Sequence, residues 1–101
     1  MTITAATGTA TAVPVITLPR ESVELVVLDV AVDGTPVTTY QVQVVDAGHR
    51  PADDAWVAPD TAGPDTGVLI TGLPVGVHWV WVRYASNPET PVQLAAYVRI
   101  T

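Results

Sequence analysis

The sequence predicts an all-β sandwich, built as a single domain from antiparallel strands. Short segments alternate apolar and polar side chains, which is the period of a strand with one buried face. Gly, Pro, Asn and Asp separate these segments at close intervals, as turns do, and no segment has the i, i+3, i+4 spacing of an amphipathic helix. The 101 residues suffice for one core, and the absence of cysteine excludes disulfides as the source of its stability.

The first twelve residues differ from the rest in composition. Residues 1–12 are almost entirely Thr, Ala and Gly, which supply no large side chain to a core. We expect a flexible or extended N-terminal arm here. A flexible leader and a threonine-rich extended arm that becomes ordered only against a neighbouring molecule are both consistent with this composition. The sandwich itself would then occupy residues 13–101.

Three strands are predicted in the first half of the sandwich. Residues 13–18 form a short edge strand, because Pro14 has no N–H to donate to a central ladder. A longer strand covers residues 23–32. Asp-Gly-Thr-Pro at 33–36 predicts a tight turn that leads into the strand 37–46. The alternation places four side chains on one face of the first longer strand and three on one face of the second: Val26, Leu28, Val30 and Val32, then Tyr40, Val42 and Val44.

The second half begins with loops and ends with three strands. Residues 46–67 are rich in acidic and turn-forming residues, and a short crossing strand is expected at 56–58. Residues 68–73, 77–85 and 92–100 complete a set of seven strands. Their expected inward side chains are His78, Val80, Val82, Tyr84, Val92, Leu94, Ala96, Val98 and Ile100.

The strand at residues 77–84 is unusual because it has two apolar faces. Trp79, Trp81 and Arg83 alternate with the inward set, and such an outer face would normally be polar. Either the 46–67 loop packs over the tryptophans, or they contact another protein. The neighbouring C-terminal strand adds an aromatic and a cationic side chain to the same face. The predicted interface therefore consists of Trp79, Trp81, Arg83, Tyr97 and Arg99.

Two segments carry a resemblance to known families. Residues 72–80, Gly-Leu-Pro-Val-Gly-Val-His-Trp-Val, resemble the segment before strand F in immunoglobulin-like and fibronectin type III-like domains. The aromatic residue that closes this corner is usually Tyr, and His78 or Trp79 stands in its place. We expect His78 to fill the corner and to hydrogen-bond the backbone.

Residues 80–92, Val-Trp-Val-Arg-Tyr-Ala-Ser-Asn-Pro-Glu-Thr-Pro-Val, resemble a hairpin of small Ig-like proteins of tailed bacteriophage particles. The resemblance covers about residues 13–101. It implies an antiparallel Ig-like or fibronectin type III-like β-sandwich. It also implies a structural part of the virion.

The charge balance disfavours several partners. The chain has ten acidic residues, four arginines and no lysine, which gives a net charge of −6. Nucleic acids and anionic membrane surfaces attract clustered positive charge, so we expect no nucleic acid and no membrane as partner. The start of the chain lacks the basic residues and the apolar stretch of a signal peptide. We therefore expect a protein that is made and used without membrane export. Together with the resemblance above, this implies a protein that is made in the host cytoplasm and resides in the virion.

No motif of a catalytic, cofactor-binding or metal site is present. There is no nucleophile elbow, no glycine loop for phosphate and no zinc-binding helix, and His49 lies in a loop where no orienting acid or nucleophile is evident from the sequence. We expect no enzymatic activity and no cofactor. Four acids in the middle loops do not have the spacing of a calcium loop and are expected to be solvated: Asp53, Asp54, Asp60 and Asp65.

Two hypotheses about function follow. The first is a non-enzymatic structural protein of a bacteriophage particle, a capsid-surface decoration or minor capsid protein. It would form homo-oligomers and contact the major capsid protein or other virion proteins through the predicted interface. The alternative is a carbohydrate-binding or adhesive module that stacks sugars on Trp79, Trp81 and Tyr97.

Overall fold

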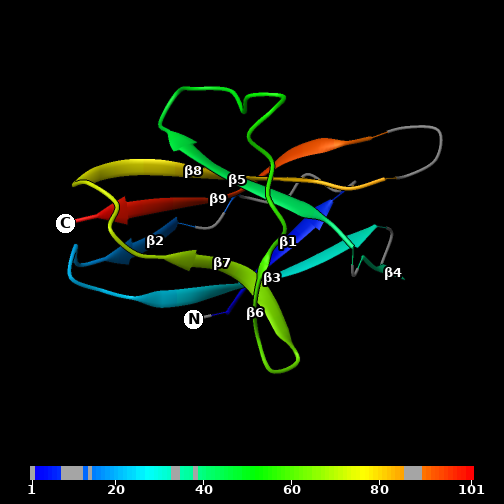
Figure 1. The fold of residues 1–101 in the computed structure, drawn as a ribbon, viewed down its shortest axis with the longest axis horizontal. Helices are drawn as coiled ribbons and strands as arrows, with labels where there is room; N and C mark the ends of the chain where they lie inside the picture. Colours follow the sequence, from blue (N-terminus) through cyan, green and yellow to red (C-terminus); the bar gives the residue numbers. More distant parts are fainter. Residues whose placement is uncertain (1, 8–12, 14, 33–34, 38, 86–89) are drawn as a thin grey trace.

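The computed structural model of the chain consists of two β-sheets packed face to face (Figure 1). The structure describes residues 2–7, 13, 15–32, 35–37, 39–85 and 90–101. Among these residues there are strands, turns and bends but no helix. The predicted all-β sandwich is therefore confirmed.

The first sheet has the strand order β1-β3-β7-β6, and the short β4 also pairs with β3. Its strands are β1 (Thr2–Thr7), β3 (Glu24–Val32), β4 (Thr35–Pro36), β6 (Asp60–Ala62) and β7 (Asp65–Ile70). Neighbours are antiparallel except for β1, which runs parallel to β3. We call this sheet A.

The second sheet, sheet B, has the strand order β2-β9-β8-β5. Its strands are β2 (Val15–Leu18), β5 (Gln41–Asp46), β8 (Gly76–Arg83) and β9 (Val92–Ile100). Here β2 is parallel to β9 and the other pairs are antiparallel. The edge strands are therefore β2 and β5 in sheet B, and β1 and β6 in sheet A.

The two parallel pairs differ from the purely antiparallel arrangement that the sequence predicted. Both involve an N-terminal edge strand, and the segment between β1 and β3 contains β2, which lies in the other sheet. That segment is long enough for the crossover that parallel strands require. The N-terminal arm is thus extended over Thr2–Thr7, with a partner strand in the same chain, whereas residues 8–12 lie outside the described residues.

The core lies between the inner faces of the two sheets, as the alternation predicted. Most of the residues predicted to face inward are buried, among them Val26, Leu28, Val30, Val42, Val80, Val82 and Val98. Val44 is partly buried against them. The predictions for Leu94 and Val92 are wrong, because a bulge between Val80 and Trp81 pairs Leu94 with Trp81 and Val92 with Arg83 on the outer face, where Val92 is 39% exposed. Ala95 and Ala96 are both buried at this bulge.

The strand limits also differ in places from the sequence prediction. β5 is shorter than the predicted strand 37–46, and β7 begins before residue 68. The predicted crossing strand at 56–58 is reduced to a single bridge between Val57 and Val42. Of the predicted turn at 33–36, residues 33–34 lie outside the described residues, and Thr35–Pro36 form the short strand β4, which pairs with β3.

Candidate interaction surface

A row of apolar side chains crosses all four strands of sheet B on its outer face. Val15 of β2 is in register with Tyr97 of β9, Tyr97 with Trp79 of β8, and Trp79 with Val45 of β5. These residues alternate with the buried positions of their strands, which places them on the face away from the core. Val15 is 65% exposed, and the other three are half-buried. We call these four residues the aromatic row.

The two rings of the row are packed edge to face. The Trp79 and Tyr97 centroids lie 5.5 Å apart with an interplanar angle of 62°, and the Trp79 and Trp81 centroids lie 6.4 Å apart at 48°. Tilted arrangements at these distances are favourable for aromatic quadrupoles. The rings therefore hold one another in place, and they do not form a flat shared platform.

The next register position adds charge and more apolar surface. Arg99 of β9 pairs with Val77 of β8, and both residues are exposed. Val77 is 42% exposed. The open half of the outer face of sheet B thus combines the aromatic row with a valine and a guanidinium group.

The other half of this outer face is covered by the chain's own loop, residues 47–59, which leaves β5 and passes back across sheet B toward β6 (Figure 1). The side-chain amide of Gln43 donates to the carbonyl oxygen of Ala52 at 2.9 Å and accepts from its N–H at 2.8 Å. Val42 and Val57 exchange two backbone hydrogen bonds. The loop is therefore attached at two places along β5.

Two cation–π contacts also join the loop to β8 on this half of the outer face. The guanidinium carbon of Arg50 lies 5.5 Å from the Trp81 ring centroid, and that of Arg83 lies 4.8 Å from the Trp56 centroid. Trp81 is only 8% exposed, and no described residue accepts a hydrogen bond from its indole N–H. The loop therefore shields the Trp81 ring from solvent on this half of the sheet.

The structure divides the interface that the sequence predicted. Trp79, Tyr97 and Arg99 lie together on the open half of the face. Trp81 and Arg83 do not join them, because the loop over residues 47–59 covers the half of the sheet on which they lie. Of the two explanations for the tryptophans, packing under the loop therefore applies to Trp81, and an open surface remains at Trp79.

Sequence reasoning missed four residues of this region. The signal for Val15 and Val45 was present in the alternation of their strands, but their register with Trp79 depends on strand pairing. Arg50 and Trp56 gave no periodic signal, because both lie in an irregular loop. Their contacts with sheet B depend on the path of that loop.

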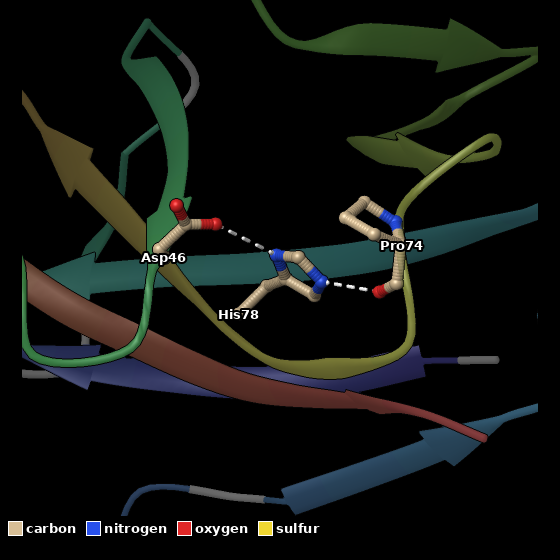
Figure 2. A network of polar contacts seen from close by, with 3 residues as sticks. All are labelled: Asp46, Pro74 and His78. Carbon is tan, nitrogen blue, oxygen red and sulfur yellow. Dashed lines mark hydrogen bonds and ion pairs between the residues drawn. The ribbon is translucent and has the colours of Figure 1, made fainter.

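His78 fills the corner that precedes β8, as the sequence predicted (Figure 2). Its side chain is buried with Val80, Val82 and Tyr84, so the predicted inward set of this strand is confirmed. Nε2 lies 2.7 Å from the carbonyl oxygen of Pro74 and must donate, since a carbonyl oxygen only accepts. Nδ1 lies 3.6 Å from Oδ1 of Asp46.

Replacing His78 by Phe should lower the free energy of unfolding by about 0.5–1.5 kcal/mol, because the part-buried hydrogen bond from Nε2 to the Pro74 carbonyl is lost. His78→Gln should cost less, since its amide N–H₂ is able to reach the same carbonyl. Urea denaturation of the two variants measures the difference. Equal losses would show that ring packing, and not the hydrogen bond, stabilises the corner.

The acidic loops show no metal site. Asp53, Asp54, Asp60 and Asp65 are exposed, and Asp60 accepts a hydrogen bond from the Leu69 N–H at 2.7 Å. Within the part of the chain that the structure describes, no three His, Cys, Asp or Glu side chains are grouped to hold a metal ion. The same part contains no helix long and apolar enough to span a membrane.

Comparisons with known proteins found no matching family model, no matching curated protein and no matching solved structure.

Proposed function

We propose that this protein is a non-enzymatic structural component of a bacteriophage particle, a capsid-surface decoration or minor capsid protein. It contacts virion proteins and further copies of itself through the aromatic row, Val77 and Arg99. The resemblance of residues 80–92 to Ig-like phage proteins is the reason for proposing that the protein belongs to a bacteriophage particle. The aromatic row carries the proposal of protein contacts, since it is an apolar stripe outside a core that is already filled.

The composition of this surface suits a protein partner. Trp, Tyr and Arg are the residues most enriched among those that dominate binding energy at interfaces. Trp79 and Tyr97 fix each other's orientation before binding, so little side-chain entropy remains to be lost. A stable interface buries about 800 Å² on each partner, and the row would supply its centre.

The geometry does not favour the carbohydrate-binding alternative. Sugar stacking requires open ring faces, but Trp81 is buried under Arg50 and the loop. Trp79 and Tyr97 are tilted by 62° to each other and share no plane on which one sugar ring would lie. The tilted pair instead forms an uneven apolar surface, which a complementary protein surface is able to match.

A pair of matched substitutions tests this function. Val77 and Leu69 are 42% and 44% exposed, and they lie on the outer faces of opposite sheets. Val77→Asp should reduce the amount of this protein on purified particles at least about tenfold, which corresponds to about 1.4 kcal/mol of binding energy. Leu69→Asp should leave the amount unchanged. Quantitative mass spectrometry of purified virions measures both.

Two results would contradict the proposal in different ways. If the wild-type chain is repeatedly missing from intact virions, the proposed particle function is wrong. If the chain is present and the two aspartate variants are retained equally, the protein is a virion component but sheet B is not its contact surface.

A further inference from the structure

A cavity of about 590 Å³ opens where β5 begins and β8 ends. Its lining includes Tyr40, Gln41, Arg83, Tyr84 and Thr90. Small-molecule sites in proteins typically have volumes of about 300–1,000 Å³, with mostly apolar walls and a few fixed polar groups. The cavity lies apart from the aromatic row, beside the half of sheet B that the loop covers.

The guanidinium group of Arg83 is held in place within this lining. Its Nε donates to Oε1 of Gln41 at 2.6 Å, and its guanidinium carbon lies over the Trp56 ring at 4.8 Å. These contacts fix both the direction and the plane of the group. A guanidinium that is already oriented loses little conformational entropy when it binds a planar anion.

Arg83 has no acidic partner among the described residues. The ion pairs found there join Arg20 to Glu21 and His78 to Asp46. With Nε engaged by Gln41, the terminal nitrogens of Arg83 keep N–H donors for a ligand.

The two tyrosines supply the apolar walls of the cavity. Tyr40 and Tyr84 are buried, and the Tyr40 hydroxyl is engaged with Oγ1 of Thr66 at 2.8 Å. No described residue hydrogen-bonds the Tyr84 hydroxyl. The cavity therefore offers a fixed cation and a phenol beside apolar walls.

We propose that this cavity binds a carboxylate group carried on an apolar body, with Arg83 as the anchor. The carboxylate accepts N–H bonds from the guanidinium group, and the apolar body packs against the tyrosine rings. Charge-assisted bonds of this kind are roughly twice as strong as neutral ones. The carboxylate belongs either to a small molecule or to the end of a peptide segment of a partner protein.

Benzoate and its neutral isostere benzamide test the proposal on the wild-type protein. The indole N–H of Trp56 reports binding in ¹⁵N-edited NMR, because this ring lies under Arg83. We expect benzoate to shift this signal saturably, with a dissociation constant at least about tenfold below that of benzamide. Equal affinities, or no saturable shift with benzoate, would overturn the proposal without reliance on any variant.

Two arginine variants then locate the anion. Arg83→Gln should weaken benzoate binding at least about tenfold. Arg50→Gln should not, because Arg50 also stacks on a tryptophan but does not line the cavity. A loss of binding in both variants, or in neither, would show that Arg83 is not the anchor.

A short peptide with a free C-terminal carboxylate and its amidated form distinguish the two sources. Tighter binding of the free-carboxylate peptide than of benzoate assigns the site to a partner protein. Tighter binding of benzoate assigns it to a small molecule. Preference for the amidated peptide over the free carboxylate would overturn the proposal.

Discussion

Val82→Asp is expected to abolish cooperative folding of this protein. Val82 is 0% exposed and lies in the core between the two sheets. An aspartate there would be either a buried unpaired charge or a protonated acid in apolar surroundings, and both cost several kcal/mol. A domain of this size has a total stability of only about 5–15 kcal/mol. Circular dichroism and urea denaturation of the purified variant measure the loss.

The matched control is the same substitution on the opposite face of the same strand. Val77 of β8 is exposed, so Val77→Asp should keep a cooperative unfolding transition close to that of the wild type. Val82→Asp with a wild-type transition would contradict the assignment of the inner face. Loss of folding in Val77→Asp would show that the outer face is also essential for stability.

Trp81→Ala should lower the free energy of unfolding of the isolated chain by about 2–4 kcal/mol. Truncating a buried tryptophan typically costs about 3–5 kcal/mol. Part of this loss is offset here, because the substitution also removes a buried indole N–H that has no hydrogen-bond partner in the part of the chain that the structure describes. The contact of Arg50 with the ring is lost as well. Urea denaturation of the monomer gives the value.

Trp79→Ala provides the comparison for this prediction. Trp79 is half-buried on the open part of the same face, so its truncation should cost the monomer less and weaken association more. The reverse ranking would mean that the loop does not protect Trp81. In that case Trp81, and not Trp79, would be the residue that contacts a partner.

Alternation along the strands was sufficient to predict the inner faces of the sandwich. A period of two assigns every second residue to one side, and the side that contains Val26, Val42 and Val82 is predominantly apolar. The corner residue His78 was predictable for the same reason, since it shares the phase of Val80 and Val82. Leu94 was not, because a single extra residue in a bulge reverses the phase beyond it.

Local sequence pattern could not predict whether the edge strands run parallel or antiparallel to their neighbours. It also could not predict which of the tryptophans the loop covers. A strand has the same alternation whether its neighbour is parallel or antiparallel, so β1 and β2 carried no signal of their direction. The sequence also left open whether Trp81 packs within the chain. That depends on the path of residues 47–59, which the bridge between Val42 and Val57 fixes.

The same bridge has a consequence for aggregation. β5 is an edge strand of sheet B, and an unpaired edge is a template for strands of other molecules. The loop occupies part of that template through the two hydrogen bonds between Val42 and Val57. A local opening of the loop would expose a sheet edge and the Trp81 ring in one step. Exposure of the β5 edge to other molecules therefore requires only a local opening of this loop, well short of global unfolding.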